Sequence, residues 1–161
     1  MENAEKWLIE YLKNQPAESE KVPRQVVQWK PLDKATYKIN VDATTFAGAG
    51  TGLGVVVRDK NGVFCCAGVR RTRIQWTSEL AELQAIKFGL EIAVEKGFVP
   101  GEIESDCLGA VQQIEKEETS MAEEGAESEK VREMIDSLNG LMGIQFSVRE
   151  STRATHIFAH I

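Results

Sequence analysis

The stretch Tyr37-Lys38-Ile39-Asn40-Val41-Asp42 alternates between apolar and polar residues. Successive side chains of a β-strand point to opposite faces of its sheet, so this period of two predicts a strand with Tyr37, Ile39 and Val41 on one face. Asp42 then lies on the other face, near the end of the strand. Because aspartate is disfavoured within strands, this position marks Asp42 as a candidate functional residue.

Two further strands are predicted to follow, at Leu53 to Arg58 and at Val63 to Val69. The small-residue turn Ala47-Gly48-Ala49-Gly50 leads into the first of them. Between the two, Asp59-Lys60-Asn61-Gly62 carries the Asn-Gly signal of a tight hairpin. Three antiparallel strands are therefore expected to open the domain.

A long amphipathic helix is predicted next. Thr77 and Ser78 are candidate N-caps, and Gly97 and Pro100 end the pattern. Between these signals, apolar residues recur at the spacing of a single helical face: Leu83, Ile86, Leu90, Ala93 and Val94.

The rest of the chain adds a short strand at Gly101 to Ser105, with Asp106 at its junction with a helix that begins at Leu108. Gly143 is expected to break a later helix, and Ile144 to Val148 to form a fifth strand. That later helix is marked by four apolar residues: Val131, Met134, Ile135 and Leu138. With a final helix at Ser151 to Ile161, the order of the predicted elements is βββαβααβα, which indicates an α/β fold with five strands.

The segment from Glu115 to Lys130 holds seven glutamates and only two lysines. Such composition favours a solvated, mobile connection between two helices.

The length of 161 residues suits one domain with a short appendage. Helical spacing predicts a short helix from Glu5 to Asn14, and Pro16 to Pro31 has the composition of a linker. We therefore expect residues 1–28 to form the helix and linker, and residues 29–161 to form the domain.

Net charge and cysteine content limit the classes of function. With 25 acidic and 19 basic residues, the net charge of −6 argues against coating nucleic acid by bulk electrostatics, so nucleic-acid binding is expected to be local or bridged by metal. Three cysteines, an odd number, form neither a disulfide framework nor a zinc-ligand spacing. No targeting signal or long apolar run is evident. We expect an intracellular monomer, in the nucleus or cytoplasm, without a membrane partner.

Three carboxylates occupy element ends in a pattern that suggests a site. Asp42 closes the first strand, Glu82 lies one turn into the long helix, and Asp106 follows the fourth strand. If the first and fourth strands are neighbours and the helix packs across them, the three acids converge. Each acid alone is more often structural, but together they offer the oxygen ligands that Mg²⁺ or Mn²⁺ prefers.

Sequence motifs around these acids occur in a specific order: Lys38-Ile39-Asn40-Val41-Asp42-Ala43, Gly52-Leu53-Gly54-Val55-Val56-Val57-Arg58-Asp59, Ala81-Glu82-Leu83-Gln84-Ala85-Ile86 and Ile103-Glu104-Ser105-Asp106. With the lead-in Gln28-Trp29-Lys30-Pro31, they resemble the plant RNase H-type (reverse-transcriptase-like) domain over Trp29 to Ile161. Such domains occur in stand-alone plant proteins and at the ends of non-LTR retrotransposon polyproteins. The resemblance implies an RNase H-like fold, with a five-stranded mixed sheet flanked by helices. It also implies Mg²⁺-dependent cleavage of the RNA strand of RNA–DNA hybrids, with Asp42, Glu82 and Asp106 as metal-binding and catalytic residues.

The fourth carboxylate of that family is replaced here. Its motif Arg-Glu-x-Asn-x-x-Ala-Asp corresponds to Arg149 to His156, with Thr152 in the Asn position and His156 in the Asp position. Many plant members carry histidine there. A neutral imidazole can bind a metal or move a proton, so His156 is expected to assist catalysis. The alternative is a catalytically weakened or inactive domain that binds nucleic acid or a protein partner.

Several smaller signals have two interpretations. Arg70, Arg71 and Arg73 either contact phosphates or form a solvated strand end. Trp76 is better explained as a core residue than as a base-stacking one. Glu79 is expected to be a charge of the cap region.

Overall fold

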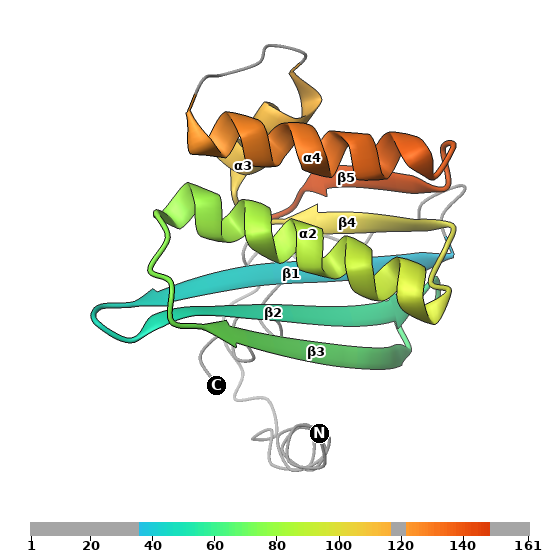
Figure 1. The fold of residues 1–161 in the computed structure, drawn as a ribbon. Coiled ribbons are helices and arrows are strands. Elements are labelled where there is room, and N and C mark those ends of the chain that lie inside the picture. Colours follow the sequence, from blue (N-terminus) through green and yellow to red (C-terminus); the bar gives the residue numbers. More distant parts are fainter. Residues whose placement is uncertain (1–35, 117–121, 149–161) are drawn as a thin grey trace, which may run out of the picture. The chain divides into compact units, whose positions relative to one another are not determined.

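The structure, a computed structural model, describes residues 36–116 and 122–148, which belong to the compact unit Pro31–Ile161. The described part contains these elements: β1 (Tyr37–Phe46), β2 (Gly50–Asp59), β3 (Phe64–Thr72), α2 (Ser78–Lys96), β4 (Gly101–Ser105), α3 (Leu108–Glu115), α4 (Glu123–Ser137) and β5 (Met142–Phe146). The strands form one sheet in the order β3-β2-β1-β4-β5, antiparallel at β1–β2 and β2–β3 and parallel at β1–β4 and β4–β5 (Figure 1). The predicted fold class is confirmed.

Strand β1 is longer than the alternating stretch that predicted it. Its pairing with β2 continues from Tyr37↔Asp59 to Phe46↔Gly50. Ile39 and Val41 are fully buried on one face, as expected. Lys38, Asn40 and Asp42 alternate with them and are buried as well, so β1 carries a buried polar face beside its apolar one.

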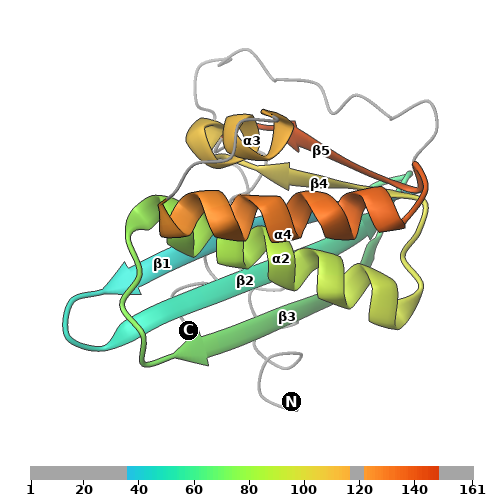
Figure 2. The same ribbon diagram turned by 45° about the horizontal axis from the view of Figure 1, so that its top comes forward.

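Helix α2 begins and ends at the predicted caps. The Thr77 hydroxyl accepts a hydrogen bond from the Leu80 N–H at 3.3 Å, and Gly97 ends the helix in the left-handed conformation at φ 75°. The expected apolar face is buried except at Val94, which is 54% exposed. Figures 1 and 2 show α2 running across β1 and β2 with α4 beside it, so both helices cover the same face of the sheet.

The prediction that residues 115–130 form a mobile connection is wrong for those of them that the structure describes. Helix α4 begins at Glu123, eight residues before Val131, which is the first apolar residue that marked this helix in the sequence. Glu127 is buried against α2, and its carboxylate accepts hydrogen bonds from the ammonium groups of Lys87 at 3.0 Å and Lys130 at 3.2 Å. Burial alone would raise the pKa of Glu127, but these two lysines outweigh it and lower that pKa. Pairing with the two lysines therefore compensates the charge of Glu127, the buried glutamate in the described part of this segment.

The end of α4 also differs from the expectation. The turn into β5 is made by Asn139 at φ 52° and Gly140 at φ 79°, not by Gly143. Strand β5 therefore starts at Met142, two residues earlier than predicted, and Gly143 lies inside it. The predicted N-terminal helix and linker and the predicted final helix fall outside the described residues. Within residues 36–116 and 122–148, no helix is long and apolar enough to cross a membrane.

Candidate metal centre

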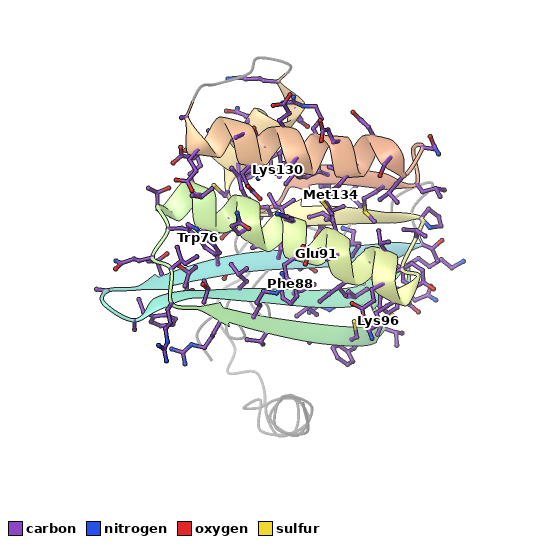
Figure 3. The ribbon with its side chains drawn as sticks, viewed as in Figure 1. Trp76, Phe88, Glu91, Lys96, Lys130 and Met134 are labelled. Carbon is purple, nitrogen blue, oxygen red and sulfur yellow. The ribbon has the colours of Figure 1, made fainter. Side chains whose placement is uncertain are left out.

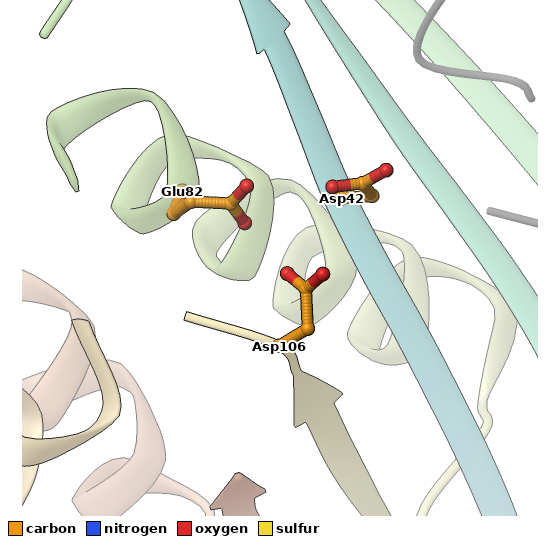
Figure 4. A group of neighbouring side chains, drawn as sticks. All are labelled: Asp42, Glu82 and Asp106. Carbon is orange, nitrogen blue, oxygen red and sulfur yellow. The ribbon is translucent and has the colours of Figure 1, made fainter. Parts of the chain in front are cut away.

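The topology brings the three predicted carboxylates to one end of the sheet. Strands β1 and β4 are parallel neighbours, and their pairing ends at Asn40↔Glu104. Asp42 lies two residues beyond Asn40, and Asp106 lies two beyond Glu104. Helix α2 crosses this end of the sheet and contributes Glu82 from its first turns. Figure 4 shows the three carboxylates directed into a common space.

Asp42, Glu82 and Asp106 each place one carboxylate oxygen within 4.8 Å of the others. Asp42 is 2% exposed and Glu82 is 7% exposed, while Asp106 is half-buried. The backbone N–H of Ala43 orients two of them, since it donates to Asp42 Oδ1 at 3.0 Å and to Glu82 Oε1 at 3.3 Å. The group is therefore compact and fixed by a strand, a helix and a strand end.

The electrostatics of the group favour a cation. Burial, then the negative charges of Asp42 and Asp106, raise the pKa of Glu82 to about 9, although the Ala43 N–H acts in the opposite direction. Glu82 Oε2 is buried and has no hydrogen-bond partner among the residues that the structure describes. An unpartnered oxygen beside two further carboxylates is a donor set that fits a hard divalent cation such as Mg²⁺ or Mn²⁺.

Of the other candidate residues, His156 lies outside the described residues, so its predicted role stays a prediction. Glu79 does not join the metal group. It accepts a hydrogen bond from the side-chain amide of Gln113 at 3.0 Å, which links α2 to α3. Trp76 packs against the apolar core, as the sequence analysis expected.

Within the basic cluster, Arg70 has structural partners. Its guanidinium forms an ion pair with Glu91 at 2.8 Å and lies 4.2 Å from the centre of the Phe88 ring. Phe88 and Glu91 both belong to α2 (Figure 3), so Arg70 ties β3 to that helix. The predicted third strand extends over Arg70 and Arg71 as far as Thr72.

A group of polar side chains next to the carboxylates in β1 and β4 was not predicted from the sequence. Glu104 is buried and accepts hydrogen bonds from Lys38, Asn40 and Gln145. The alternating sequence did indicate that Lys38 and Asn40 share the polar face of β1 with Asp42. Their bonds to Glu104 could not be predicted, because they depend on the register between β1 and β4.

This sheet order, with helices on one face and carboxylates at the ends of β1 and β4, defines an RNase H-like fold. The same fold is found in RNase H1 from the archaeon Halobacterium salinarum, with a TM-score of 0.67, 19% identity, and coverage of 77% of this chain and 94% of that one. It is also found in LC11-RNase H1, isolated from compost by a metagenomic approach and solved in complex with an RNA/DNA hybrid. That complex has a TM-score of 0.67, 17% identity, and coverage of 77% of this chain and 94% of that one.

The foamy viral protease-reverse transcriptase, also solved with an RNA/DNA hybrid, has a TM-score of 0.68 and 11% identity, and the match covers 98% of this chain and 26% of that one. Residues 40–161 match the family model described as "Reverse transcriptase-like". The chain therefore belongs to the reverse transcriptase-like family. No curated protein matches it.

Proposed function

We propose that this chain is a divalent-metal-dependent endoribonuclease that cleaves the RNA strand of RNA–DNA hybrids. The observation that carries the proposal is the convergence of Asp42, Glu82 and Asp106, within 4.8 Å, on an RNase H-like fold. Two structures with this fold, LC11-RNase H1 and the foamy viral enzyme, are complexes with RNA/DNA hybrids, which supports the substrate class.

Asp42, Glu82 and Asp106 would hold Mg²⁺ or Mn²⁺. When bound, such an ion lowers the pKa of water and stabilises the charge on the leaving oxygen of a phosphodiester. The chain supplies rigid placement: Asp42 and Asp106 stand on neighbouring strands, and Glu82 approaches from the helix. The Ala43 N–H fixes the orientation of the Asp42 and Glu82 carboxylates. His156, in the position of the family's fourth acid, is proposed to move a proton at the reacting phosphate.

From the sequence motifs we further propose that the chain is a plant RNase H-type domain, either stand-alone or derived from a non-LTR retrotransposon polyprotein. It acts on nucleic acid as a monomer in the nucleus or cytoplasm, without a membrane partner.

The direct test is cleavage by the full chain of a hybrid labelled on its RNA strand, in Mg²⁺, in Mn²⁺ and in chelator. Asp42→Asn is expected to lower the rate by at least about 100-fold, because it removes a charged ligand from the metal group. Asp136→Asn is the matched control, since Asp136 is exposed on α4. Activity that survives Asp42→Asn excludes the proposed site.

A second candidate function is hybrid binding without cleavage. It is favoured by one observation, the histidine at position 156 where the family motif has its fourth acid. Converting His156→Asp separates the two candidates. A nuclease weakened at this position gains activity, whereas a domain that only binds does not.

A further inference from the structure

The separation of Asp42 and Asp106 is not set by direct pairing of the strands that carry them. Backbone pairing between β1 and β4 stops at Asn40↔Glu104. Beyond that pair, β1 continues beside β2 as far as Phe46, and β4 ends at Ser105. Both carboxylates therefore lie just past the last point at which their strands are joined.

A buried side-chain network occupies that last point. Glu104 is 4% exposed and accepts hydrogen bonds from the side-chain amides of Asn40 at 2.7 Å and Gln145 at 2.9 Å. It also forms an ion pair with Lys38. Asn40, Glu104 and Gln145 occupy one row across β1, β4 and β5, because Asn40 pairs with Glu104 and Glu104 pairs with Gln145.

The hydrogen bonds and the ion pair of Glu104 involve a charged group in a buried position. Hydrogen bonds to a carboxylate are stronger than those between neutral groups, and burial strengthens them further. The ammonium group of Lys38 supplies the compensating charge that a buried carboxylate needs. On the other side of β1, the Arg58 guanidinium donates to Asn40 Oδ1 at 3.4 Å. The side chain of Asn40 is thus held from both neighbouring strands, two residues before Asp42.

We propose that Glu104 is a positioning residue for the metal centre. Through Asn40 and Lys38 it holds β1 against β4 at their last paired row, and so fixes the separation at which Asp42 and Asp106 face a cation. The inference rests on the metal site of the proposed function. Gln145 contacts the same carboxylate from β5, so its bond joins β4 to β5 and does not hold β1.

The test compares two amides that donate to one carboxylate. Mn²⁺ is titrated into the full chain, and bound metal is measured by calorimetry and by loss of the free Mn²⁺ paramagnetic resonance signal, well below the unfolding temperature. Asn40→Leu is expected to weaken Mn²⁺ binding about 10-fold, as loss of a group that supports a metal ligand commonly does. Gln145→Leu removes the equivalent bond on the other side and is expected to change the affinity by less than about 2-fold.

A purely structural role predicts that the loss of Mn²⁺ affinity in each variant follows its loss of unfolding free energy. Affinity losses that follow destabilisation in this way, or no loss in Asn40→Leu, overturn the inference. If Asn40→Leu does not fold, Asn40→Ser is used, because its short hydroxyl does not reach Glu104, and the same loss is expected. If Asn40→Leu binds Mn²⁺ with normal affinity and the wild type cleaves the hybrid, the positioning role is rejected and the nuclease function is supported. A selective loss of Mn²⁺ in a protein that does not cut hybrids supports positioning and rejects the nuclease. Absence of Mn²⁺ binding to the wild type rejects both.

Discussion

Gly89 of α2 lies directly against Val41 of β1: a Cβ atom added at Gly89 would come within 2.7 Å of Val41 Cγ1 and 3.3 Å of Ile39 Cγ2. Helix and strand approach this closely only because residue 89 has no side chain. Val41 precedes Asp42, and Gly89 shares its helix with Glu82. This close contact therefore joins the helix that carries Glu82 to the strand that carries Asp42.

Gly89→Ala is expected to destabilise the protein by about 1–3 kcal/mol, because the strain of an overpacked core exceeds the gain in helix propensity of about 1 kcal/mol. Urea unfolding measures the change. Combining it with Val41→Ala makes room for the new methyl group, so the double variant should lose less stability than the sum of the two single changes. If the two losses of stability are strictly additive, contact with Val41 is not the reason why a methyl group at position 89 destabilises the protein.

Glu82 gives the metal-free protein a specific dependence of stability on pH. Its pKa is about 9 in the folded protein against an ordinary value of 4.5, so folding favours the protonated form. The stabilising contribution of that form is complete below pH 4.5 and is lost as pH rises toward 9. In chelator, the free energy of unfolding is expected to fall between pH 5 and pH 9 by a few kcal/mol, an order of magnitude set by about 1.4 kcal/mol per pKa unit.

Glu82→Gln removes this titration, so the variant gains stability relative to the wild type as the pH rises. Glu133→Gln, an exposed change on α4, should follow the wild type at each pH and serves as the control. Saturating Mn²⁺ should restore the stability of the wild type at pH 9 but not add comparably to Glu82→Gln. Identical pH curves for wild type and Glu82→Gln would contradict the assignment.

Arg70 is expected to matter for stability and not for substrate. Arg70→Met keeps an apolar stem near Phe88 but removes the ion pair with Glu91, both partners of which are partly exposed. Partly exposed pairs contribute little, so a loss of about 0.5–1 kcal/mol is expected in urea unfolding. The salt dependence of hybrid binding should be unchanged. A shallower salt dependence in Arg70→Met would instead assign Arg70 to phosphate contact.

Local signals account for most of what the sequence predicted correctly. Side-chain alternation around Ile39 and Val41 and the caps at Thr77 and Gly97 depend only on nearby residues, so the start of β1 and both ends of α2 were predicted correctly. Convergence of Asp42 with Asp106 needed one further assumption, that the first and fourth strands are neighbours, and the β1–β4 pairing confirms it.

Interactions between distant segments were not predictable in the same way. The bonds from Lys38 and Asn40 to Glu104 join residues 66 and 64 positions apart, and they follow from strand register, which the alternating pattern leaves open. Likewise, Glu127 is 40 positions from Lys87, its partner on α2. Composition suggested a solvated segment because it counts charges without showing which of them are paired.

The helical start of α4 is therefore expected to depend on that pairing. Lys87→Met leaves the Glu127 carboxylate without its closer and less exposed partner, and should cost about 1–3 kcal/mol at pH 7, whereas Lys130→Met should cost less than about 1 kcal/mol because Lys130 is largely in solvent. Because the pKa of Glu127 is lowered in the folded protein, its stabilising effect is present above pH 4.5 and is lost as the pH falls through the folded pKa. Urea unfolding of wild type and Glu127→Gln should thus converge in acid and differ at neutral pH. If Lys87→Met and Lys130→Met are equally mild, a buried ion pair does not hold α4 against α2.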